Sequence, residues 1–314
     1  MERFANRMSA DCNMLNTAGL TPDDIARDVK NLPSAPKVLP RLKQLLGDTN
    51  SAMHDIVRLI RLDPGIAARV LQMANSAYFS KGARCFTVDE AVHRIGYERV
   101  YELVAYAVAS QVLVRPLAVY GLEADELWKQ SVACAIAAEM LALRTGQDRN
   151  VAYTTGLLHC VGMIAIDDWS QRHAQTQVLV STGFQKEATD AERALFGFTQ
   201  ADAGAALLRL WDFPLSMSEP LRWQYLPRAS IAHGKMASLL YAAKWLRTAV
   251  CAGPKARIPM PEMGPMQTLA LTPPVLQGMV VEIEQQLADI SSLLDTSPGP
   301  KAADRDEHRF PSQV

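Results

Sequence analysis

The 314-residue sequence has almost no net charge, no paired CxxC cysteines and no long apolar run. With 32 basic against 33 acidic residues, no overall field draws the chain to nucleic acid or to anionic lipid. Apolar stretches such as residues 104–114 reach about half of the ~20 residues that a membrane-spanning helix needs. The first residues also lack the apolar region of a secretion signal. We therefore expect a cytoplasmic protein that neither binds DNA sequence-specifically nor inserts into a membrane.

Sequence signatures of common enzyme classes are missing as well. There is no P-loop, no GxGxxG motif and no GxSxG elbow. We also find no run of alternating polar and apolar residues that predicts β-strands. The five cysteines lie mostly in apolar helical sequence, which is typical of reduced thiols in a core. The composition, 49% hydrophobic and 21% charged, is that of an ordinary globular protein.

Capping residues predict a series of short helices in the first part of the chain. Each stands directly before a segment whose apolar residues recur at helical spacing, and the last of these segments ends at Gly96. A further helical pattern, over residues 38–46, ends at Gly47. The capping residues are Thr21, Ser51, Asp63 and Thr87.

Longer helical patterns follow, and they suggest a division of the chain. We expect helices over 124–144, 151–166, 187–196, 200–211, 230–249 and 273–294, with a proline-containing loop between the last two. This gives an all-α protein with a flexible N-terminus (1–20), an amino-terminal lobe of short helices (21–120), a second helical lobe (121–294) and a disordered tail (295–314).

Several motifs in order resemble the HDOD (HD-related output domain) family over roughly Leu32 to Val250. They are LPSAPKVL, DPGIAARVLQMANSAYF, TVDEAVHRIGYERV, ELWKQSVACA, GLLHCVGMIAI and ERALFGFTQADAGAALLRLWDFP. The resemblance implies a two-lobed helical protein whose carboxy-terminal lobe is similar to HD-superfamily metal phosphohydrolases. It also implies an output or adaptor role in bacterial signal transduction.

The resemblance identifies the positions at which HD-superfamily enzymes hold their metal, and most of them carry other residue types here. They are Gln130, His159, Cys160, Gln200, Gln224, Tyr225 and Lys244. Metal-assisted hydrolysis needs several imidazole and carboxylate ligands around one cation. A single imidazole with amides, a thiol and an ammonium does not supply them. We therefore expect no metal, no cofactor and no catalytic residue.

Alternatives remain for these positions. His159 and Cys160 suit zinc by residue type, but adjacent helical residues point about 100° apart, so we favour a hydrogen-bonded core histidine and a small core thiol. Lys244 and the three amides instead suit a nucleotide phosphate, which would make the protein a small-ligand receptor. Trp223, beside Gln224, is a candidate wall of such a pocket. Residual phosphohydrolase activity is a further alternative.

The string Asn75-Ser76-Ala77-Tyr78-Phe79 has two interpretations. It suits a partner-facing corner built on Asn75, Ser76 and Tyr78, or a helix end at which Asn75 closes the turn and the aromatic rings fill the core.

The leading hypothesis is a non-catalytic signalling adaptor that acts through protein–protein contacts. Its expected partner is a diguanylate cyclase, sensor kinase or response regulator. Since no receiver or cyclase segment fits in the remaining residues, we expect it to meet that partner in trans.

Overall fold

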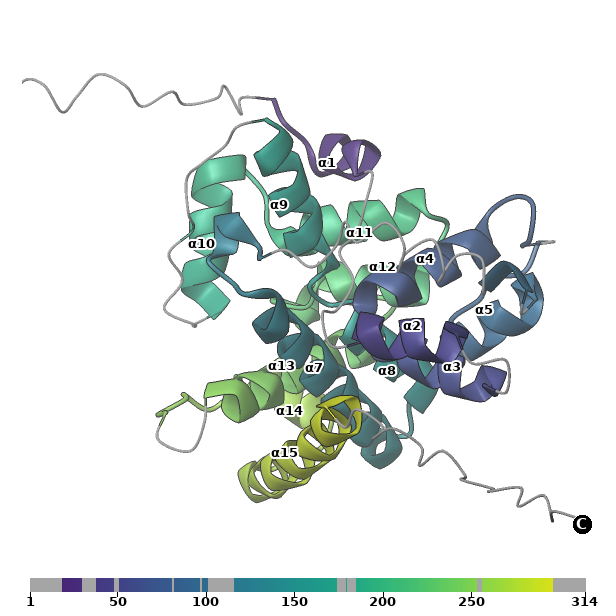
Figure 1. Ribbon diagram of the computed structural model, residues 1–314. Helices are drawn as coiled ribbons and strands as arrows, with labels where there is room; N and C mark the ends of the chain where they lie inside the picture. Colours follow the sequence, from purple (N-terminus) through teal and green to yellow (C-terminus); the bar gives the residue numbers. More distant parts are fainter. Residues whose placement is uncertain are drawn as a thin grey trace, which may run out of the picture.

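The computed structural model is built of α-helices, as the sequence predicts (Figure 1). It describes residues 19–29, 38–47, 51–80, 82–96, 98–100, 116–173, 179, 185–252 and 256–295. Within these ranges the β-structure is limited to one isolated bridge between Leu117 and Leu122. No helix among them has the length and hydropathy needed to cross a membrane. The expected flexible N-terminus and disordered tail lie almost wholly outside the described residues.

The described helices of the first part are α1 (Pro22–Asp28), α2 (Val38–Gly47), α3 (Met53–Ile60), α4 (Pro64–Asn75) and α5 (Val88–Ile95). Three of the five, α1, α4 and α5, begin at predicted caps. Side chains of Thr21, Asp63 and Thr87 each accept a hydrogen bond from a first-turn backbone N–H. The prediction for Ser51 is wrong, because α3 starts one residue later and its N-cap, Ala52, has no side-chain acceptor.

The later helices are α7 (Ala124–Thr145), α8 (Arg149–Leu157), α9 (Val161–Arg172), α10 (Gln185–Phe196), α11 (Gln200–Leu210), α12 (Leu215–Arg222), α13 (Gly234–Ala252), α14 (Met263–Thr268) and α15 (Pro273–Asp295). Sequence patterns missed α12, which contains Pro220, and α14, which lies at the end of the expected proline loop. Both are short helices with prolines, for which helical periodicity is a weak signal.

The expected single helix over 151–166 is wrong, because residues 158–160 break it into α8 and α9. One glycine in each helix allows a close approach to a neighbour, of α8 to α7 and of α9 to α11. A Cβ on Gly156 would lie 2.8 Å from the carbonyl oxygen of Cys134 on α7. A Cβ on Gly162 would lie 1.8 Å from the carbonyl oxygen of Gln200 on α11. The break therefore seats His159 and Cys160 between α7 and α11.

The buried apolar residues form one cluster that runs through both parts of the chain. Figure 1 shows α2 to α5 together on one side and α13 to α15 on another, with α7 between them. Trp128 on α7 donates to the carbonyl oxygen of Leu62 (3.1 Å), and Tyr153 on α8 donates to that of Arg61 (3.0 Å). Helix α1 comes first in the chain but packs against α9 and α11 of the later part. The boundaries of the two expected lobes stay a prediction.

Candidate functional site

The seven positions that the family resemblance identifies come together in one buried polar cluster. Four elements carry them besides the break after α8: Gln130 lies on α7, Gln200 begins α11, Gln224 and Tyr225 follow α12, and Lys244 lies on α13. His159, Cys160, Gln200, Gln224 and Lys244 are all at most 1% exposed. The fold therefore brings these residues together, whereas the sequence did not predict which contacts they make.

Arg247 joins Gln130 and His159, and no sequence pattern points to this residue. Its guanidinium Nη1 lies 3.0 Å from Oε1 of Gln130 and 3.2 Å from Nε2 of His159. The other imidazole nitrogen, Nδ1, lies 2.8 Å from the carbonyl oxygen of Gly156, which can only accept. His159 is therefore a neutral imidazole that donates through Nδ1 and accepts through Nε2. Burial, followed by the charge of Arg247, lowers its pKa well below the usual value.

Lys244 lies one turn before Arg247 on α13, and its ammonium group rests on an aromatic ring. Its Nζ is 3.2 Å from the ring centroid of Tyr225. The Tyr225 hydroxyl accepts from Nε2 of Gln200 at 2.8 Å. Burial, and next the charge of Arg247, lower the pKa of Lys244 well below its ordinary range. The ring thus replaces part of the hydration of this amine, but no salt bridge neutralises it among the described residues.

Among the described residues, Glu192 on α10 is the buried carboxylate whose charge acts on Lys244. Its Oε1 accepts from the Tyr120 hydroxyl (3.0 Å), and its Oε2 accepts from the backbone N–H of Gln200 (2.9 Å). Burial raises its pKa to about 7, against the opposing effect of these hydrogen bonds and of Lys244. Sequence analysis missed Glu192 and Tyr120, because their roles depend on a contact between α10 and a turn 72 residues earlier.

The remaining members of the cluster are held as structural groups. Gln224 donates through Nε2 to the carbonyl oxygens of Leu221 (2.9 Å) and His159 (3.1 Å), and so fixes the break after α8. Cys160 lies 3.0 Å from the Ser131 hydroxyl. Burial raises the pKa of this thiol above its ordinary value, so Cys160 is a neutral core thiol rather than a thiolate ligand.

These contacts do not fit a divalent cation. Coordination by His159 would use the Nε2 lone pair, which Arg247 already occupies, and two cationic groups would face the ion. The described residues contain no group of three His, Cys, Asp or Glu side chains arranged to hold a metal. Trp223, expected as a possible pocket wall, donates instead to Oε2 of Glu219 (3.0 Å).

The other histidines are not part of this cluster, and their scattered positions among polar and charged residues predict surface side chains. His54, His93 and His173 are exposed and His233 is partly exposed, whereas His308 lies outside the described residues.

A second candidate surface lies at the corner between α4 and α5. The three residues predicted for it, Asn75, Ser76 and Tyr78, differ in how far they are exposed. Asn75 is 1% exposed, and its amide exchanges two hydrogen bonds with the backbone of Cys85 (2.7 and 3.1 Å). Asn75 therefore does not present its side chain to a partner. Ser76 bonds back to the carbonyl oxygen of Met73 (2.7 Å), whereas Tyr78 is 83% exposed. The core-filling interpretation is thus wrong for the Tyr78 ring.

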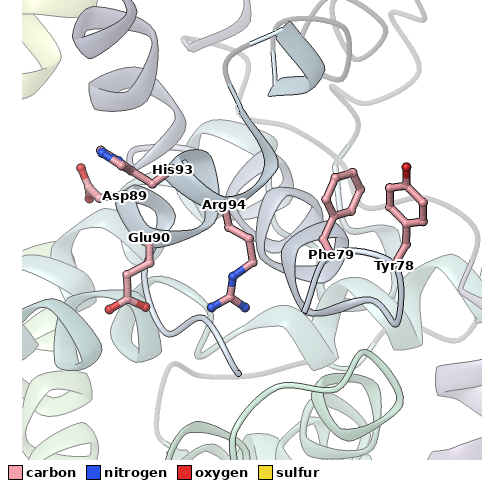
Figure 2. A pocket seen from close by; sticks show the side chains of 6 residues that line it. All are labelled: Tyr78, Phe79, Asp89, Glu90, His93 and Arg94. Atoms are coloured by element: carbon pink, nitrogen blue, oxygen red, sulfur yellow. The ribbon is translucent and has the colours of Figure 1, made fainter. Parts of the chain in front are cut away.

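Figure 2 shows this corner from close by, with Tyr78 and Phe79 on one side of a hollow. Side chains of α5 line the opposite side, and the open volume is about 1000 Å³. The α5 residues are Asp89, Glu90, His93 and Arg94. The corner therefore combines exposed aromatic surface with charges of both signs.

Comparison with known proteins identifies the chain. An HDOD domain model matches residues 32–227. An uncharacterized protein from Treponema pallidum (strain Nichols) is 28% identical over 213 residues, which are 65% of this chain but 40% of that protein. The chain therefore spans well under half the length of this relative.

Solved structures share the fold at low sequence identity. The MmoQ response regulator from Methylococcus capsulatus str. Bath superimposes with a TM-score of 0.65 at 18% identity, over 80% of this chain and 98% of that one. A virulence factor from Campylobacter jejuni subsp. jejuni gives 0.59 at 17% identity, over 86% and 93%. Since the HDOD model covers more than half of the sequence, this chain belongs to the HDOD family.

Proposed function

We propose that this protein is a non-catalytic signalling module that acts through contacts with a partner protein. Membership of the HDOD family supports a signalling role. Similarity in fold to a protein described as a response regulator is consistent with it. The partner would be another signalling protein, such as a diguanylate cyclase, a sensor kinase or a response regulator.

One observation carries the non-catalytic part of the proposal: the guanidinium of Arg247 bridges His159 and Gln130. In a metal phosphohydrolase these two positions would hold the cation that activates water and polarises the phosphoryl oxygen. A guanidinium is a cation too, but it cannot deprotonate a water by coordination. In this proposal the former metal position has become a structural centre that holds α7, α13 and the α8–α9 break together.

Metal analysis of the purified full-length chain tests this part. After expression in medium supplemented with manganese, iron and zinc, we expect substoichiometric metal and no hydrolysis of a generic phosphodiester such as bis-p-nitrophenyl phosphate. The Arg247→Leu variant is the informative comparison, because it frees the His159 lone pair without adding a ligand. Stoichiometric metal in the wild-type protein, with turnover that a chelator abolishes, would return the chain to the phosphohydrolases.

The exposed corner at Tyr78 is the surface on which we place partner contact. Exposed aromatic side chains carry much of the energy of protein interfaces, and this one stands beside a charged hollow. A photoreactive phenylalanine derivative at Tyr78 should cross-link to one of the three named partner classes when each is added as a purified protein. The same derivative at Leu143, 62% exposed on α7, is the matched control. Equal cross-linking at both positions, or none at Tyr78 with all three partners, would overturn this placement.

A further inference from the structure

Four buried polar atoms in the cluster have no hydrogen-bond partner among the described residues. Two are acceptors, Oε1 of Gln200 and Oε1 of Gln224. Two are donors, Nζ of Lys244 and Nε of Arg247. An unsatisfied buried polar group costs about 1–3 kcal/mol, and a charged one costs more. Four such atoms at one place therefore call for an occupant that satisfies both kinds.

The contacts around Tyr225 and His159 bring these atoms together. Gln200 bonds to the Tyr225 hydroxyl, and Lys244 lies on the ring of the same residue. Gln224 precedes Tyr225 in the chain and bonds to the carbonyl oxygen of His159. The imidazole of His159 in turn accepts from Arg247. Tyr225 and His159 thus link the four side chains: Tyr225 contacts Gln200 and Lys244, and His159 contacts Gln224 and Arg247.

Charge indicates the sign of the occupant. Lys244 and Arg247 are one turn apart on α13, and neither forms a salt bridge with a described carboxylate. The charge of the buried Glu192 acts on Lys244, but the two carboxylate oxygens of Glu192 already accept hydrogen bonds from Tyr120 and Gln200. Arg247 is a cation, and an anion beside Lys244 would favour the charged form that burial of this amine opposes, so the cluster favours an anion.

The free amide oxygen of Gln224 indicates that the anion also carries a hydrogen-bond donor. Gln224 must present its Oε1 as the free acceptor, because its Nε2 donates to two carbonyl oxygens that cannot donate in return. A ligand that satisfies it needs a donor group as well as negative oxygens. Chloride and sulfate lack such a donor near neutral pH, whereas a hydrogenphosphate has both an oxyanion and a hydroxyl.

We propose that the cluster binds inorganic phosphate, which near neutral pH carries a hydroxyl as well as negative oxygens. Its negative oxygens would accept from Lys244 and Arg247, and its hydroxyl would donate to Gln224. Arg247 and Gln130 are partly exposed, so they form the side through which the group would enter. A phosphodiester such as cyclic di-GMP lacks the hydroxyl and should not bind here.

Titration of the full chain in phosphate-free buffer tests the proposal. Inorganic phosphate should raise the melting temperature saturably, and sulfate and cyclic di-GMP at equal ionic strength should not. Guanosine monophosphate should stabilise the protein much less than inorganic phosphate, because the second pKa of a phosphomonoester is about 6 and most of its groups carry no hydroxyl near neutral pH. Lys244→Met should weaken phosphate binding by about tenfold or more, as expected for the loss of one charge-assisted hydrogen bond. The exposed Lys129→Met on α7 is the control and should change nothing.

A second measurement keeps the test independent of how well Lys244→Met folds. In crystals of the wild-type chain grown with arsenate, a phosphate analogue, anomalous scattering should place arsenic within hydrogen-bond reach of Lys244 Nζ and Gln224 Oε1. Arsenic elsewhere, or equal stabilisation by phosphate and sulfate, would overturn the proposal. Such a failure leaves the proposed function intact, because that function rests on the absence of metal-dependent turnover and on the Tyr78 contact.

Discussion

Two buried amides, one in each part of the molecule, are treated differently by the fold. Asn75, at the end of α4, has both its oxygen and its nitrogen bonded to the backbone of Cys85. Gln224, after α12, has its nitrogen bonded twice and its oxygen left without a described partner. Both side chains are at most 1% exposed. The first is a finished structural contact, and the second belongs to a set of polar atoms that the protein alone does not satisfy.

Two buried charged side chains, one in each part, show the same difference between a group with a hydrogen-bond partner and a group without one. Asp63 is fully buried, and its Oδ1 accepts from the backbone N–H of Ile66 (2.9 Å) at the start of α4. Lys244 is equally buried but has an aromatic ring in place of an acceptor. A buried polar group that is satisfied locally specifies the fold, whereas one that is left unsatisfied costs stability and points to a role outside folding.

Loss of the Asn75 amide should have the largest effect. Asn75→Ala leaves the N–H and C=O of Cys85 buried without partners, so we expect the free energy of unfolding to fall by about 4 kcal/mol. Urea denaturation measures this. Asn150→Ala, at an exposed asparagine in the first turn of α8, is the control and should stay within about 0.5 kcal/mol. A loss below 1 kcal/mol at Asn75 would contradict its role as a structural contact.

The carboxylate of Glu192 should make stability depend on pH. The folded state raises its pKa from 4.5 to about 7, so as pH rises through this window the unfolded chain gives up its proton first. Stability from this group is present below pH 4.5 and is lost by about pH 7, a decrease of about 3 kcal/mol for 2.5 pKa units. Glu192→Gln should remove this pH dependence, as measured by urea unfolding between pH 4.5 and 8.

The exposed Asp190→Asn, on the same helix α10, is the control for that series and should leave the pH dependence of the wild-type protein in place. A profile for Glu192→Gln that runs parallel to the wild-type profile would show that another group is responsible.

Replacement of Lys244 should act in the opposite direction to replacement of Asn75. Lys244→Met removes a buried amine that has no described hydrogen-bond acceptor and keeps a side chain of similar length. In phosphate-free buffer we expect the free energy of unfolding to rise by about 1–2 kcal/mol. A loss of more than 1 kcal/mol would mean that the cation–π contact with Tyr225 outweighs the cost of burial.

Tyr78 should show the smallest effect on stability. Its ring is 83% exposed, so Tyr78→Ser should change the free energy of unfolding by less than about 0.5 kcal/mol. The same substitution should weaken the affinity for the partner protein. Isothermal titration calorimetry with the partner that cross-linking identifies measures this affinity. An effect of equal size on folding and binding would place Tyr78 with the structural residues.

Local sequence signals predicted the helices well where caps and periodicity agreed. Thr21, Asp63 and Thr87 start helices as expected, because a side-chain acceptor before an apolar periodic segment decides a helix start without help from distant residues. The prediction failed at the α8–α9 break. Residues 151–166 carry apolar side chains at helical spacing, and the break depends on the close approach of Gly156 to α7 and of Gly162 to α11.

The candidate site was predicted as a set of positions and not as a set of contacts. Family resemblance selected Gln130, His159 and Lys244, and these do meet in space. Arg247 carries the bridge between two of them, yet in the sequence it is one of many arginines on helices. Its partners lie 88 and 117 residues away, and only the packing of α13 against α7 and α8 brings them within reach.

By itself, the sequence determined the all-helical architecture, the family and the loss of the residue types that hold a metal, because helix caps, motif order and ligand chemistry are local properties. The tertiary structure alone decided which contacts the residues at these positions make. Whether an arginine reaches a histidine, and whether an amide oxygen is left without a donor, depends on distances between helices that no local pattern encodes.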